Sequence, residues 1–140
     1  MTRSEDLYGR EHVERYRATN GDEGYVWKRG ATILLLTTTG RRSGESRVQP
    51  LIYRDVDGKP VIVASKGGAP EHPAWYLNLR EHPEVEVQIK GEVFGATARV
   101  VEGDERARLW DRMVEVWPPY ADYQRKTDRE IPVVVLERTA

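Results

Sequence analysis

Residues 32–65 read TILLLTTTGRRSGESRVQPLIYRDVDGKPVIVAS, and the pattern of these residues indicates the fold class. It contains short runs of β-branched and aliphatic residues at 32–38, 48–54 and 61–65. Two turn signals separate these runs: a glycine-bounded segment at 40–44 and the pair Asp57-Gly58, a strong hairpin signal. We therefore predict three consecutive antiparallel strands, and we expect the first to be buried on both faces because its apolar residues are continuous.

The flanking sequence adds helices and further strands to this pattern. We expect, in chain order, a helix at 5–18, a loop at 20–24, an irregular glycine-proline segment at 66–73, a helix at 74–81, strands at 85–89 and 92–101, a helix capped by Asp104 that runs to Val116 and stops at Pro118-Pro119, a polar segment at 121–130 and a strand at 133–137. This order predicts a mainly β protein with flanking helices (α+β), in which an antiparallel sheet closes into a small barrel. A Rossmann fold is excluded, because regular βαβ alternation and the GxGxxG motif are both missing.

The composition is that of a soluble globular chain of 140 residues, with 32% charged and 39% hydrophobic residues. There is no cysteine, which excludes disulfides, thiolate catalysis and cysteine-ligated metals and fits a cytoplasmic protein. We expect neither a signal peptide nor a membrane-spanning helix, while peripheral contact with the inner face of a membrane stays open.

The charge is unevenly distributed along the chain. A net charge of −1 argues against a nucleic-acid-binding protein. Between residues 38 and 66, however, six lysines and arginines face only three acidic residues. A basic region inside a nearly neutral protein suits a small anionic ligand better than a polyanion.

Several catalytic motifs are missing from the sequence. It contains no GxxxxGK[ST], no GxSxG and no HExxH. The three histidines, His12, His72 and His82, lack metal-ligand spacing, so we predict no metal site. If the protein is an enzyme, a bound cofactor therefore carries its chemistry.

Four segments remain as candidates for a binding site. They are Gly40-Arg41-Arg42-Ser43-Gly44, Ser65-Lys66-Gly67-Gly68, the helix start at 72–78 with Trp75, and the proline-flanked segment at 117–124 with Tyr120 and Tyr123. Each also has a plain structural explanation: a solvated hairpin loop, an ordinary turn, or aromatic core packing. Taken together they indicate one ligand that is flat at one end and anionic at the other.

The same segments carry a family resemblance. The stretches ILLLTTTGRRSG, QPLIY, VIVASKGGAPEHPAWYLNL, PEVEVQIKGEV, ARVVEGDERARLW and PPYADYQRKTDREIPVVVLE cover nearly everything from Ile33 onward. They resemble the deazaflavin-dependent nitroreductases, the F420H2-dependent quinone reductases, whose fold is a split β-barrel like that of FMN-binding proteins. The resemblance implies a variable helix and loop at 1–30 and a cofactor-binding barrel at 31–140.

The resemblance also implies a cofactor and a reaction. The cofactor is reduced coenzyme F420, whose tail carries a phosphate and several carboxylates, and the acceptor of its hydride is a small quinone or nitroaromatic molecule. The cofactor-binding residues implied are Arg41, Arg42, Ser43, Arg47, Val48, Gln49, Pro50, Leu51, Ile52, Val63, Ala64, Ser65, Lys66, Ala74, Trp75, Tyr76, Leu77, Asn78 and Tyr120. Ser65, Tyr120 and Tyr123 match the substrate-facing, catalytic positions, whereas Trp117 stands where a nitroimidazole-activating member has tyrosine. The alternative is a barrel that binds F420 or FMN without turnover.

Overall fold

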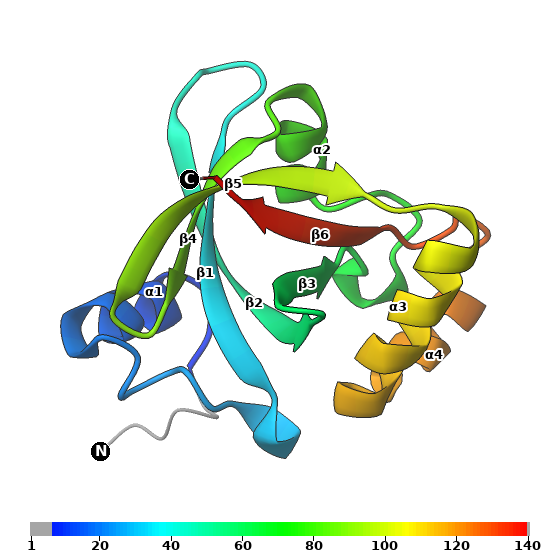
Figure 1. Ribbon diagram of the computed structural model, residues 1–140, viewed down its shortest axis with the longest axis horizontal. Helices are drawn as coiled ribbons and strands as arrows, with labels where there is room; N and C mark the ends of the chain where they lie inside the picture. The colour runs from blue at the N-terminus through cyan, green and yellow to red at the C-terminus, as the bar shows by residue number, and fades with distance from the viewer. Residues whose placement is uncertain (1–6, 140) are drawn as a thin grey trace.

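The computed structural model describes residues 7–139 and confirms the predicted barrel. Its six strands pair antiparallel in the closed order β1-β2-β3-β6-β5-β4, with the helices outside (Figure 1). The elements are α1 (Gly9–Thr19), the 3₁₀ turn η2 (Lys28–Gly30), β1 (Thr32–Thr39), β2 (Ser46–Val56), β3 (Lys59–Val63), the 3₁₀ turn η3 (Lys66–Gly68), α2 (Ala74–Glu81), β4 (Glu84–Ile89), β5 (Glu92–Val100), α3 (Gly103–Val116), α4 (Pro119–Arg125) and β6 (Val133–Arg138).

Three apolar clusters account for the packing. Leu34 and Leu36 of β1 point into the barrel and pack with residues of β3, β4 and β6. Ile33 and Leu35, on the opposite face of the same strand, pack against α1. A third cluster joins the outer face of β3 and β6 to α3 and α4. The first strand is therefore buried on both faces, as its continuous apolar run predicts.

The strand order is closed, but part of β2 extends past β3 and lacks a strand partner on that side. β2 pairs with β1 along 46–53, but with β3 only through residues 54–56, next to the Asp57-Gly58 turn. Along 46–53 the other edge of β2 therefore has no strand partner within residues 7–139. In Figure 1 the long β1–β2 hairpin extends beyond the barrel toward α2. This unpaired edge positions the site described below.

The structure corrects several predicted boundaries. The first helix begins at Gly9 rather than at residue 5, and residues 1–6 lie outside the described part. The third strand ends at Val63, before Ser65, because η3 follows. Asp104 lies inside the first turn of α3, and Glu102 occupies the N-cap position without a side-chain cap.

The C-terminal part of the chain contains a helix that the sequence analysis missed. Part of the segment predicted only as polar, 121–130, belongs to α4, which begins at Pro119. Proline is well suited to the first position of a helix, where its missing N–H breaks no hydrogen bond. Pro118-Pro119 therefore ends α3 and also starts α4.

Candidate functional site

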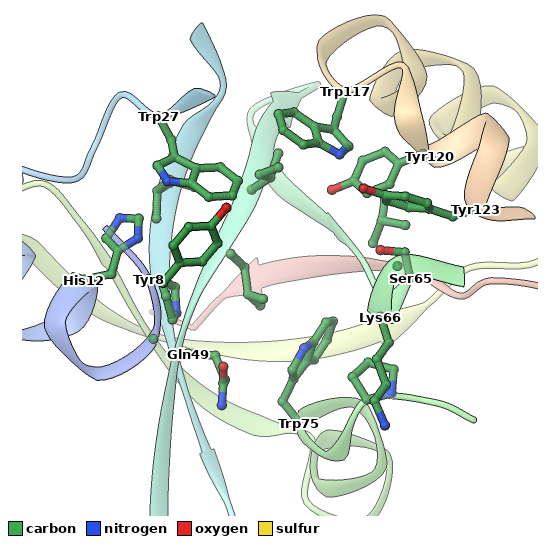
Figure 2. Close-up of a pocket in the computed structure, with 18 of the residues that line it drawn as sticks. Tyr8, His12, Trp27, Gln49, Ser65, Lys66, Trp75, Trp117, Tyr120 and Tyr123 are labelled. Carbon is green, nitrogen blue, oxygen red and sulfur yellow. The ribbon is translucent and has the colours of Figure 1, made fainter. Parts of the chain in front are cut away.

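A groove runs along the unpaired edge of β2. It consists of a larger cavity of about 550 Å³ and a smaller one of about 260 Å³. Gln49 of β2 and Ala74 and Trp75 at the start of α2 line both cavities, so the two are continuous. The larger cavity is lined by several Trp and Tyr side chains, which Figure 2 shows, together with aliphatic and polar residues. The smaller one is cationic.

The cationic slot is formed by the β1–β2 hairpin loop and lined by Arg41, Arg42 and Arg47. The loop is closed by Gly40 N–H donating to Glu45 O at 2.7 Å and by Gly44 N–H donating to Gly40 O at 2.9 Å. Gly44 has a φ of +74°, a left-handed conformation that favours glycine. The two glycines thus fix a tight turn that holds the three arginines along one slot.

Asn78 holds this loop in place. Its Oδ1 accepts hydrogen bonds from Arg41 N at 3.1 Å and from Arg41 Nη1 at 2.9 Å, and its Nδ2 donates to Thr38 Oγ1 at 3.3 Å. The Asn78 side chain is only 5% exposed. Asn78 therefore lines the slot as predicted, but its amide is already engaged in positioning Arg41.

The larger cavity presents a row of backbone donors at residues 65–67. Ser65 is right-handed, while Lys66 and Gly67 are left-handed with φ of 47° and 63°. Such an alternation directs successive N–H groups toward one point and forms an anion-binding concavity. The N–H groups of Ser65, Lys66 and Gly67 have no acceptor within residues 7–139. The Lys66 ammonium, half-exposed, lies 3.3 Å from Glu71 Oε1.

Arg129 fixes the loop that carries these donors. Its guanidinium donates to the carbonyl oxygens of Ala69 at 2.9 Å, Ala64 at 3.2 Å and Ser65 at 2.7 Å, and to His72 Nδ1 at 3.1 Å. Burial lowers the pKa of His72, and the positive charges of Arg129 and then Arg80 lower it further. The ring therefore stays neutral and can accept the hydrogen bond from Arg129. Arg129 was not predicted, because a single arginine in a polar segment carries no signal of this role.

Gly68 connects this loop to α4, which carries Tyr123. A Cβ at Gly68 would lie 2.7 Å from Tyr123 O and 2.9 Å from Tyr123 Cα. We expect Gly68→Ala to lower the free energy of unfolding by about 2 kcal/mol, from backbone strain plus displacement of α4. Denaturant unfolding followed by circular dichroism measures this.

The matched control for that prediction is Gly67→Ala. Gly67 is also left-handed, but a Cβ there would meet nothing within 4 Å. Gly67→Ala should therefore lower the free energy of unfolding only through backbone strain, by about 1 kcal/mol. Equal losses in the two variants would contradict the close approach of α4 to this loop.

The larger cavity is bounded by aromatic side chains from opposite ends of the chain. Tyr120 and Tyr123 of α4 lie with ring centroids 6.2 Å apart, edge to face. Tyr120 is 4% exposed, and burial, with Tyr123 as a smaller contribution, raises its pKa. Its hydroxyl therefore remains protonated at neutral pH, and neither tyrosine hydroxyl has a hydrogen-bond partner among the described residues. Both hydroxyls are free to donate to a ligand.

The N-terminal segment supplies a wall that the sequence analysis did not include. Tyr8, His12 and Trp27 line the cavity, and Trp27 stacks on Trp117 at 5.7 Å with an interplanar angle of 22°. Figure 2 shows Trp27 and Trp117 at one end of the cavity and Trp75 at the other. Tyr8 and Trp27 gave no distinct signal in the sequence, because the same segment also contains Tyr16 and Tyr25.

The structure brings most of the predicted residues to the groove. The larger cavity is lined by Gln49, Pro50, Leu51, Ile52, Val63, Ser65, Lys66, Ala74, Trp75, Tyr120 and Tyr123. The smaller one is lined by Arg41, Arg42, Ser43, Arg47 and Asn78, in addition to the shared residues. Val48, Ala64, Tyr76 and Leu77 line neither cavity. These four pack into the apolar clusters, and their predicted cofactor contacts stay predictions.

No group of three or more His, Cys, Asp or Glu side chains within residues 7–139 is placed to hold a metal ion. In the same range, no helix is both long and apolar enough to cross a membrane.

Comparison with known proteins gives a consistent result. Residues 7–138 match the family model described as F420H(2)-dependent quinone reductase. An F420H(2)-dependent quinone reductase of Mycobacterium tuberculosis strain H37Rv is 44% identical over 131 residues, which cover 91% of this chain and 87% of the relative. Among solved structures, an F420-H2 dependent reductase (FDR-A) is 51% identical with a TM-score of 0.70, covering 75% of this chain and 93% of that one. A second, described as a domain-swapped dimer, is 45% identical with a TM-score of 0.73, covering 91% and 96%.

Proposed function

This chain belongs to the F420H(2)-dependent quinone reductase family, and from that membership we propose that the groove binds reduced F420 and a quinone acceptor side by side. The observation that carries the proposal is the continuity of a cationic slot with an aromatic cavity through Gln49, Ala74 and Trp75. A cofactor with a flat ring and a long acidic tail needs both environments in one groove.

The donor set in the groove fits this cofactor. Arg41, Arg42 and Arg47 offer charged donors to the tail carboxylates, and planar guanidinium groups bind such anions through paired hydrogen bonds. The N–H groups at 65–67 and the Lys66 ammonium suit the phosphate. The cationic set exceeds what the single phosphate of FMN requires, which favours F420 over FMN.

The protein's share of the reaction is positioning and proton supply. Reduced F420, when bound, supplies a hydride, and with one proton this converts a quinone to a hydroquinone. Trp75 and the unpaired β2 edge would orient the flat ring, since both line the larger cavity. Ser65, Tyr120 and Tyr123 would donate hydrogen bonds to the acceptor oxygen, because the tyrosine hydroxyls are free and burial keeps Tyr120 protonated.

We propose a nitroaromatic compound as a further acceptor class, because such a molecule is also flat and electron-poor.

We also propose a cytoplasmic location with contact at the inner membrane face. The exposed side chains of Tyr8 and Val26, beside Lys28 and Arg29, would suit an anionic lipid surface.

The test of the proposed function is oxidation of reduced F420 by menadione under anaerobic conditions. We expect the absorbance of oxidised F420 to return at a rate proportional to the protein concentration. Binding of oxidised F420, measured in parallel by calorimetry, distinguishes a reductase from a barrel that binds the cofactor without turnover. Saturable binding without turnover would favour a barrel that binds the cofactor but does not react, and a lack of binding would contradict the proposal.

A further inference from the structure

The wall formed by Tyr8, Trp27 and Trp117 lies beyond the reach of the cationic slot. None of its three residues lines the smaller cavity, whereas Gln49, Ala74 and Trp75 line both. If the acidic tail of the cofactor occupies the slot, its ring would lie near Trp75, which lines both cavities, and the far end of the larger cavity would be free. With the cofactor placed in this way, the wall would face the second ligand.

The wall is held rigidly from behind. Trp27 Nε1 donates to Leu7 O at 3.1 Å, and Trp27 N donates to Ala31 O at 2.8 Å. Lys28 Nζ lies 4.5 Å from the centroid of the Tyr8 ring and 5.1 Å from that of the Trp27 ring. A ligand that stacks on a wall fixed in this way loses little free energy to ordering of side chains.

Contacts between distant segments complete the wall. The Tyr8 ring lies edge-on to Trp27 at 5.4 Å, and the Trp27 ring stacks on Trp117 at 5.7 Å. The Arg29 guanidinium lies 5.7 Å from the Trp117 ring. The N-terminal segment and the α3–α4 junction thus meet at the end of the cavity.

We propose that this wall selects the acceptor by ring size and that Trp27 and Tyr8 are its specificity-determining residues. Two indoles and a phenol offer a large apolar surface, so a fused two-ring quinone gains more contact than a one-ring quinone. The proposal rests on the proposed function, because the wall selects an acceptor only if the cofactor occupies the other end of the cavity.

The experiment measures acceptor binding without turnover. The protein is saturated with oxidised F420, and the affinities for menadione, which has two fused rings, and for 1,4-benzoquinone, which has one, are measured by calorimetry. We expect Trp27→Ala to weaken menadione binding about tenfold while benzoquinone binding changes less. Trp27→Phe should recover most of the loss, and Tyr8→Ala, at a side chain that is 59% exposed, should show a smaller loss in an intact fold.

The control variant is Val26→Ala, because Val26 is the exposed neighbour of Trp27 and does not line the cavity. If Trp27→Ala and Tyr8→Ala bind F420 and menadione as the unaltered protein does, the wall does not select the acceptor. An equal loss for both quinones would also overturn selection by ring size. If the unaltered protein fails to bind F420, the proposed function fails, and this inference fails with it.

Discussion

Replacing Arg41 and Arg42 together by alanine should raise the dissociation constant for F420 by roughly two to four orders of magnitude, because each lost charged hydrogen bond costs ~1.5–3 kcal/mol. Both arginines lie in the cationic slot, and Asn78 holds Arg41 there through two hydrogen bonds before any ligand arrives. Binding of oxidised F420 is measured by calorimetry at fixed ionic strength. The affinity for FMN, which lacks the acidic tail, should fall far less.

The matched control is Arg108→Ala with Arg138→Ala, which removes the same two charges elsewhere. These arginines form exposed ion pairs with Asp57 at 3.1 Å and with Glu92 at 3.0 Å, and neither lines the groove. Exposed pairs contribute little to stability, so the control should fold normally and bind F420 with nearly unchanged affinity. An equal loss of F420 affinity in both double variants would mean that net charge, and not the slot, governs binding.

Arg129→Ala should lower the free energy of unfolding by about 3 kcal/mol and the unfolding midpoint by roughly 10 °C. The guanidinium donates to three backbone carbonyls and to His72 at once, and its removal leaves the carbonyls of Ala64 and Ala69 without this donor, whereas Ser65 O keeps the Gly68 N–H. F420 binding should weaken as well, because the same loop carries the N–H groups of Ser65, Lys66 and Gly67. Thermal unfolding followed by circular dichroism, together with calorimetry, measures both effects.

Two further variants define this prediction. Arg129→Lys should recover little, because one ammonium cannot reach four acceptors spread around a planar fork. Arg125→Ala, which removes a side chain that is 71% exposed and paired with Asp122, should leave the midpoint almost unchanged. If Arg129→Ala unfolds at the same temperature as Arg125→Ala, the hydrogen bonds of Arg129 do not hold the loop.

The local sequence predicted most of the barrel. The runs in 32–65, the turn at Asp57-Gly58 and the helix at 74–81 all follow from short-range signals, and the structure confirms them. The signal failed where the same residues serve two elements. The pair Pro118-Pro119 follows the end of α3 and also begins α4, so the signal that stops one helix hides the signal that starts the next.

The candidate site was predicted in part, for a different physical reason. Loop residues such as Arg41, Arg42 and Lys66 can be predicted from the sequence, because a charged residue beside glycine is typical of an anion-binding loop. The structure places them in the groove. Arg129 and Trp27 gave no comparable signal, because their roles depend on contacts with residues far away in the chain, Ala64 and Trp117. Only the folded arrangement shows such contacts.

The unpaired edge of β2 has a consequence for colloidal behaviour. A bare strand edge is a template on which a strand of another molecule can add, and this leads to aggregation. Here Pro50 has no N–H to donate, so the row of backbone donors is interrupted within the unpaired stretch 46–53. The charged Arg47 lies in the same stretch, and both residues make pairing with a strand of another molecule less favourable. The same two residues that shape the groove thereby help keep the open side of the barrel from polymerising.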